Sequence, residues 1–195
     1  IAYAQSVTNP SLLSVLEADL ALDGGRTVKM SLRYFKADAA WAQVQFDTAK
    51  LAFPLLEQAF GFPYPHESVV LRQSNAIGSA GIAGVAFSSI GEVLVSNTGL
   101  GDFDREVTVH ELAHQWAGRQ LATKWIWEGQ AEWGMRAVGP QLGIMPSRSN
   151  WESLGHSDPL ATWYGGSDVY DPDYWYGKSG AFWVAFEAAV GGSAN

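Results

Sequence analysis

The stretch HELAHQW, residues 110–116, places two histidines four positions apart, with a glutamate directly after the first. On a helix, His110 and His114 lie about 40° apart around the axis and one turn from each other, so both imidazoles can reach one cation. The carboxylate of Glu111 projects beside them, where it can meet a water on that cation and take its proton. The pattern therefore predicts a zinc-type site on a helix, with Glu111 as general base.

The residues around the histidine pair are apolar, and this bears on a second interpretation. A solvated or hydrogen-bonded helix face without any metal could also contain the pattern H-E-x-x-H. The flanking positions are Val107, Val109, Leu112, Ala113 and Trp116. We therefore expect the helix to be mostly buried. Buried histidines need polar partners, which favours metal binding over a purely structural helix.

A third metal ligand must come from another element. Glu128, in WIWEGQAEW (residues 125–133), is the best candidate, and Glu132 lies one helical turn further along the same face. Such a pair allows one acid to bind the metal while the other accepts the free N–H of a ligand histidine. Two alternatives stay open at this point. Glu132 could be a solvent-facing acid, or it could replace Glu128 as the ligand.

Hydrophobic periodicity predicts strands in the first half of the chain and helices in the second. Residues 14–35 form a hairpin around the turn sequence DGG. A helix follows, with Asp38 as a possible N-cap, a kink at Pro54 and an end at Gly61. The other expected elements are strands at 67–73 and 92–96, helices at 103–118, 126–138 and 175–190, and a long loop at 139–173. This order predicts an α+β fold, with a mixed sheet followed by a mostly helical half.

Composition and charge limit the kinds of partner that the chain can have. It has 195 residues, 47% of them hydrophobic, which fits a single globular domain. A net charge of −8 without a Lys/Arg cluster argues against nucleic acid and anionic membranes. Cysteine is absent, which excludes disulfides and Cys-type zinc sites. The oligomeric state and the compartment stay open, with an extracytoplasmic location slightly favoured. Because the chain opens at Ile1 without a signal-peptide pattern, we expect a processed product or a piece of a longer protein.

The two motifs together resemble the gluzincin metallopeptidases, and specifically the aminopeptidase N family, which reads H-E-x-x-H-Q-W and later W-x-N-E-G-x-A. The likeness extends from VKMSLRYF at residues 28–35 to YGKSGAFWVAFEAAVGG at residues 176–192. It implies a thermolysin-like zinc peptidase catalytic domain over residues 1–195, with residues 1–27 as a candidate tail of a preceding β-domain. It also implies a peptide substrate and one zinc ion per chain.

The resemblance assigns a role to five residues. The zinc ligands are His110, His114 and Glu128, the general base is Glu111, and the phenol that stabilises the tetrahedral oxyanion is Tyr176. The tyrosine role also has a physical basis, because a phenol O–H aimed at the developing oxyanion makes a hydrogen bond that strengthens in the transition state. The alternative is that Tyr176 packs the final helix together with the aromatic residues before it.

The sequence departs from the family pattern at three places. The connection from His114 to Glu128 is shorter, and Ser179 is inserted into the tyrosine motif. The family's Gly-x-Met-Glu-Asn segment is replaced by GSAGIAGVAF, residues 78–87, which has no carboxylate to pair with a substrate's amino terminus. This departure argues against exopeptidase specificity. It also motivates an alternative function, a zinc-bearing scaffold that binds peptides without cutting them.

The same glycine-rich segment offers a place for the substrate. An edge strand near residues 81–87 could hold an extended peptide by main-chain pairing, and its small residues leave space for side chains. A glycine inside a strand often marks a place where another backbone approaches closely. We therefore expect Gly81, Ile82, Ala83 and Gly84 to contact a peptide substrate.

Overall fold

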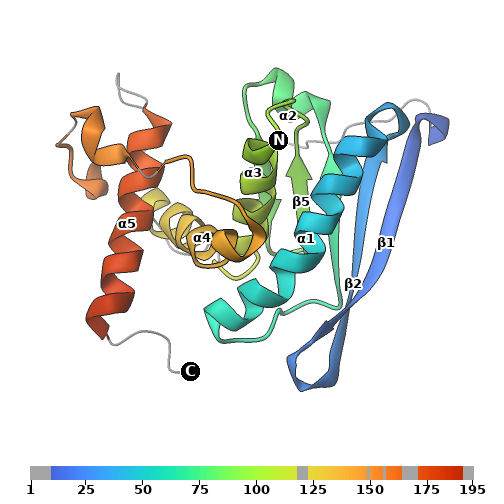
Figure 1. Cartoon of the computed structure of the whole chain (residues 1–195), viewed down its shortest axis with the longest axis horizontal. Coiled ribbons are helices and arrows are strands. Elements are labelled where there is room, and N and C mark those ends of the chain that lie inside the picture. The colour runs from blue at the N-terminus through green and yellow to red at the C-terminus, as the bar shows by residue number, and fades with distance from the viewer. Residues whose placement is uncertain (1–9, 118–122, 149, 156, 164–170, 191–195) are drawn as a thin grey trace.

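The computed structural model describes residues 10–117, 123–148, 150–155, 157–163 and 171–190 (Figure 1). Its first half is a five-stranded sheet with the order β1-β2-β3-β5-β4. The strands are β1 (Leu13–Leu22), β2 (Arg26–Phe35), β3 (Ser68–Gln73), β4 (Gly84–Phe87) and β5 (Glu92–Val95). The outer pairs β1–β2 and β4–β5 are antiparallel, whereas β3 runs parallel to both β2 and β5. The predicted hairpin and mixed sheet are confirmed.

The hairpin turn follows from its two glycines. Gly24 and Gly25 have φ angles of 71° and 73°, in the left-handed region where a side chain would be strained. After the turn, the alternation of β2 places Val28, Met30 and Leu32 in the interior, where at most 1% of each is exposed. The period of two in this strand thus directs its apolar side chains toward one face of the sheet.

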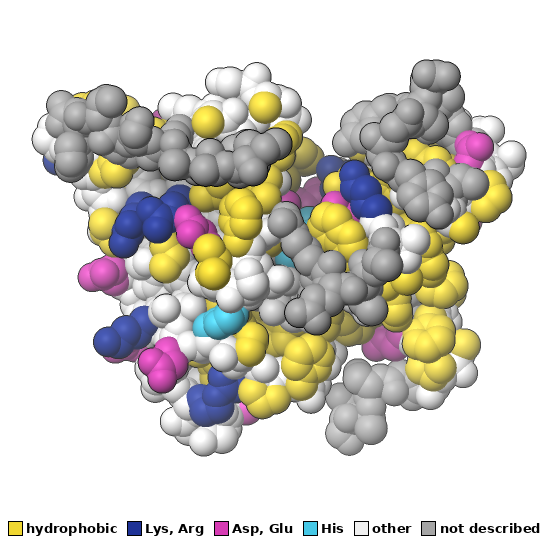
Figure 2. Space-filling model, turned by 180° about the vertical axis from the view of Figure 1, so that it is seen from behind, with side chains coloured by type: hydrophobic (Ala, Val, Ile, Leu, Met, Phe, Trp, Pro, Cys, Tyr) yellow, Lys and Arg dark blue, Asp and Glu magenta, His cyan; other side chains and the backbone are white. Residues whose placement is uncertain are grey.

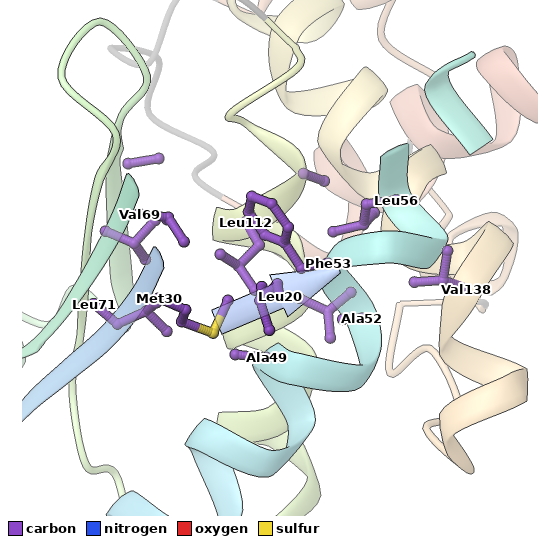
Figure 3. Close-up of a cluster of buried hydrophobic side chains, with 14 of the residues drawn as sticks. Leu20, Met30, Ala49, Ala52, Phe53, Leu56, Val69, Leu71, Leu112 and Val138 are labelled. Atoms are coloured by element: carbon purple, nitrogen blue, oxygen red, sulfur yellow. The ribbon is translucent and has the colours of Figure 1, made fainter. Parts of the chain in front are cut away.

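Helix α1 (Ala39–Phe60) packs on β1 and β2 and supplies much of the main core (Figure 3). Phe53 lies at its centre, fully buried, with its ring centroid 4.9 Å from that of Tyr64. The helix ends at Gly61, which has a left-handed φ of 73°, and it contains Pro54 within a single continuous element. Asp38 takes the N-cap position of the helix, as predicted, but its side chain makes no capping hydrogen bond. Its carboxylate instead accepts hydrogen bonds from the side-chain amides of Gln73 and Asn97.

The glycine-rich segment differs from the prediction of one strand over residues 81–87. The first two residues of the segment, Gly78 and Ser79, end a short helix, α2 (Asn75–Ser79), and strand β4 begins only at Gly84. Ile77 explains the helix, because its side chain is completely buried and its carbonyl accepts the backbone N–H of Ile82. The edge position of the strand is confirmed, since β4 pairs only with β5 in the described sheet.

The second half of the chain is helical, which confirms the α+β class. Helix α3 (Asp102–Ala113) packs against α1, β4 and β5, and α4 (Lys124–Val138) lies between α3 and α5 (Pro172–Val190) (Figure 1). Helix α3 ends earlier than predicted, although His114 keeps helical dihedrals (φ −60°, ψ −16°) as its C-cap. His114 therefore continues the helical spacing that begins at His110.

The long segment after α4 contains short 3-10 turns rather than a continuous loop. These are η4 (Gly139–Leu142), η5 (Trp151–Leu154) and η6 (Leu160–Thr162), while η1 (Pro10–Leu12), η2 (Asp23–Gly25) and η3 (Lys36–Asp38) lie in the first half. Part of the predicted loop, residues 164–170, lies outside the described residues. Among the helices that the structure describes, none combines the length and apolar character needed to cross a membrane.

Candidate metal centre

The three predicted ligands lie together between α3 and α4. One ligand atom from each of His110, His114 and Glu128 falls within 4.8 Å of the other two. The Oε2 atom of Glu128 is 3.2 Å from Nε2 of His110 and 3.2 Å from Nε2 of His114. A tetrahedral zinc ion with bonds of about 2.0–2.2 Å separates neighbouring ligand atoms by about 3.3–3.6 Å. The donor set and its spacing therefore fit zinc without large rearrangement.

The second acid of α4 lies on the other side of the first histidine. Oε2 of Glu132 is 3.3 Å from Nδ1 of His110, and the residue is 0% exposed. The side chain of Arg136 donates to Oε1 of Glu132, and Arg148 lies 3.8 Å from Oε2. The burial contradicts the alternative of a solvent-facing acid. Glu128 is the acid that reaches the Nε2 atoms, and Glu132 is the one that reaches Nδ1.

The electrostatics of the cluster favour a bound cation. Burial alone lowers the pKa of His110, but Glu128 and Glu132, together with the charge of Glu111, raise it to about 10. Burial raises the pKa of Glu128, yet both histidines hold it below the usual range. Burial also raises the pKa of Glu132, and His110, Arg148 and Arg136 lower it. Carboxylates held in their charged form around buried imidazoles attract a proton or a metal ion, and the two compete for the same nitrogen atoms.

Glu111 lies against the edge strand β4. A Cβ atom at position 84 would lie 2.8 Å from Oε1 of Glu111 and 2.8 Å from Cγ1 of Val107. Only glycine at this position leaves room for the carboxylate between β4 and α3. The predicted close approach at a strand glycine is therefore present, but a side chain makes it rather than another backbone.

Tyr176 on α5 lies beside His110 and lines the same site. Its ring centroid is 5.6 Å from that of His110 and 5.0 Å from that of Trp163. The guanidinium of Arg148 lies over the same ring at 4.8 Å. The inserted Ser179 is accommodated within the helix, fully buried, where its hydroxyl donates to the backbone oxygen of Tyr176.

A pocket of about 500 Å³ joins these groups. It is lined by the four predicted substrate-contact residues Gly81, Ile82, Ala83 and Gly84, and by His110, Glu111, Glu128 and Tyr176. Figure 2 shows a recess on this face, between the sheet half and the side that carries α5, with histidine and acidic surface inside it.

Sequence reasoning missed two cations that line the pocket, Lys124 and Arg148. Lys124 lies before the predicted start of the helix at residue 126, and only the earlier start of α4 puts it on one face with Glu128, four residues on. Arg148 lies in the long segment between α4 and α5, where no periodicity predicts its position. Only tertiary packing brings it to the site.

Comparison with known proteins places this arrangement in a known fold. No protein-family model matches the chain. An M1 zinc metallopeptidase from Deinococcus radiodurans superposes with a TM-score of 0.67 at 23% identity, covering 92% of this chain and 41% of that one. A mutant of this metallopeptidase bound to a Tyr-Ser-Ala substrate superposes with a TM-score of 0.60 at 20% identity. The chain shares the fold of the M1 zinc metallopeptidases.

A similarity in sequence comes from a much longer protein. Protein TMA108 of Saccharomyces cerevisiae is 25% identical over 163 residues, which are 77% of this chain and 14% of that protein. The chain thus spans less than half the length of these relatives. The extent of the domain, including the place of residues 1–27, stays a prediction.

Proposed function

We propose that the chain is a thermolysin-like catalytic domain of a gluzincin peptidase related to aminopeptidase N, which holds one zinc ion and hydrolyses peptide bonds. The observation that carries the proposal is the buried set of His110, His114 and Glu128, with Glu111 beside it in a pocket open to a peptide. The fit of the three donor atoms to zinc and the shared fold both support it. The donors are two imidazoles and one carboxylate, which leave a fourth position open, as in catalytic rather than structural zinc sites.

A zinc ion held there would supply Lewis acidity that polarises a peptide carbonyl and acidifies nearby water. Glu111 takes the proton of the attacking water on its carboxylate and passes it to the leaving amine. The phenol of Tyr176 donates a hydrogen bond to the oxyanion that develops on the carbonyl. Glu132 lies against Nδ1 of His110, which leaves Nε2 of that histidine free to hold a zinc ion.

The substrate would lie along β4 as an extended strand. One edge of β4 pairs with β5, and its other edge can pair with a peptide backbone. Gly81, Ile82, Ala83 and Gly84 line the pocket at this place and have small side chains or none, apart from Ile82. Main-chain pairing would then position the peptide, while helices α3, α4 and α5 supply the reacting groups.

The pocket supports cleavage without a requirement for a free amino terminus. Among the described lining residues, the carboxylates are Glu111 and Glu128, and the mechanism uses both. A protonated amine in a partly dehydrated pocket needs a carboxylate of its own, because an unpaired buried charge is costly. Exopeptidase specificity is therefore not part of the proposal. The missing acid also favours a second candidate function, a zinc-bearing scaffold that binds peptides without cutting them.

Elemental analysis and turnover of a peptide library test the proposal together. The wild-type protein, purified without added metal, should contain one zinc per chain and cut peptides. Glu111→Gln should keep the zinc and lose roughly 10²- to 10⁴-fold in kcat/KM, because it removes the base and leaves the ligands. Zinc without any turnover in the wild type would favour the scaffold. A protein that binds no zinc would contradict both functions.

A further inference from the structure

Lys124 is a cation placed inside the candidate substrate pocket. It is the first residue of α4, and its side chain lines the pocket together with Glu128, one helical turn further on. Four residues of helix correspond to a rise of about 6 Å. The backbone of Lys124 is therefore about 6 Å from that of the proposed zinc ligand along the helix axis, and both side chains line the same pocket.

The other charged groups of the pocket already have partners. Arg148 pairs with Glu132 at 3.8 Å and with Asp173 at 3.4 Å. Glu128 contacts both histidines, as described above. Lys124 differs from them, since among the described residues its one specific contact is with the face of Trp163, at 5.0 Å from the ring centroid. No carboxylate in the described part of the chain forms an ion pair with it.

This leaves the substrate side of the pocket with an uncompensated positive charge. The proposed mechanism uses Glu111 and Glu128, so neither is available to a substrate or to Lys124. The start of α4 adds to the effect, because the first turn of a helix carries a partial positive charge and unsatisfied N–H groups. In a chain with a net charge of −8, such a site is complementary to an anion rather than to an amine.

We propose that Lys124 is a specificity-determining residue that binds a carboxylate of the peptide substrate. The inference rests on the proposed function for its substrate class and extends it to acidic peptides. Two sources of the carboxylate share this chemistry, an Asp or Glu side chain near the scissile bond and the terminal carboxylate of a short peptide. Trp163 orients the ammonium group by a cation–π contact and excludes water on one side of it.

The experiment compares four peptides that differ only in charge. One position carries Glu or Gln, and the C-terminus is a free acid or an amide. Dissociation constants are measured by calorimetry on zinc-loaded Glu111→Gln protein, with and without Lys124→Met, and kcat/KM is measured with Glu111 intact. We expect an anionic peptide to bind about tenfold more tightly than its neutral partner, and Lys124→Met to reduce that ratio to about one. Lys124→Glu should invert the ratio.

The four peptides distinguish the two sources of the carboxylate, and a control variant tests whether the effect is specific to Lys124. A Glu-over-Gln preference in both terminal forms identifies a side-chain carboxylate, and an acid-over-amide preference identifies the terminus. Lys50→Met removes a lysine on α1 that pairs with Asp47, outside the pocket, and should leave the ratio unchanged. If Lys124→Met keeps the preference, or if no peptide binds, the proposal is overturned. Zinc content and turnover of the neutral peptide report separately on the proposed function.

Discussion

The interface between α1 and the sheet and the interface between α3 and α4 bury opposite kinds of side chain. The first contains Met30, Phe53 and Leu71, each at most 1% exposed. The second contains acids and histidines that are also buried, including Glu132 at 0% and His114 at 3% exposed. Apolar burial stabilises a fold by itself. Buried charges stabilise it only when they are paired, and under the proposed function a metal ion pairs the charges of the second interface.

The largest expected effect is the loss of the metal from a ligand variant. His114→Ala removes one of three zinc donors, and we expect zinc content to fall from one per chain to near zero. Inductively coupled plasma mass spectrometry of the folded variant measures it. Retention of a full equivalent of zinc would show that His114 is not a ligand. Metal binding would then not explain why the α3–α4 interface buries charged groups.

The core variant should show the reverse behaviour. Phe53→Ala is expected to lower the free energy of unfolding by about 3–5 kcal/mol, because it removes a large ring and leaves a cavity. Zinc per folded chain should not change. Denaturant titration followed by fluorescence provides the measurement. Leu51→Ala on the same helix is the control, since Leu51 is 61% exposed and surface changes usually stay within about 0.5 kcal/mol.

A comparison of the two acids of α4 sharpens the assignment within the site. Glu128→Gln should weaken zinc binding more than Glu132→Gln, for which we expect a loss of about 10- to 100-fold, the usual effect of removing a partner of a ligand histidine. Competition with a chelator of known affinity gives both constants. The opposite order would mean that Glu132 is the ligand and that the shorter connection after His114 has shifted the site.

The smallest expected effect concerns the amino terminus of the substrate. Acetylation of that terminus should change kcat/KM by less than tenfold, or about 1.4 kcal/mol, because no unassigned carboxylate lines the described pocket. Paired peptides with free and acetylated amines are compared under identical conditions. A hundredfold preference for the free amine would reveal an acid that pairs with it, and aminopeptidase activity would then be restored to the proposal.

Much of the candidate site could be predicted because its residues lie close together along the chain. The helical period alone places His110 and His114 on one face, and a second helix with Glu128 and Glu132 at the same spacing supplies the acids. The position of the edge strand β4 is predicted less accurately from the sequence. Local glycine content predicts a strand from residue 81, whereas β4 begins at Gly84 and the backbone N–H of Ile82 bonds to the carbonyl of Ile77 in α2.

The sequence by itself determined which side chains share a face within each element, and with that the hairpin and the histidine pair. Tertiary structure decided which faces meet. It set Glu128 against the Nε2 atoms and Glu132 against Nδ1, and it brought Arg148 and Tyr176 to one pocket from distant parts of the chain. The physical reason is that periodicity is a local property of the backbone, whereas the pairing of buried charges depends on packing between elements.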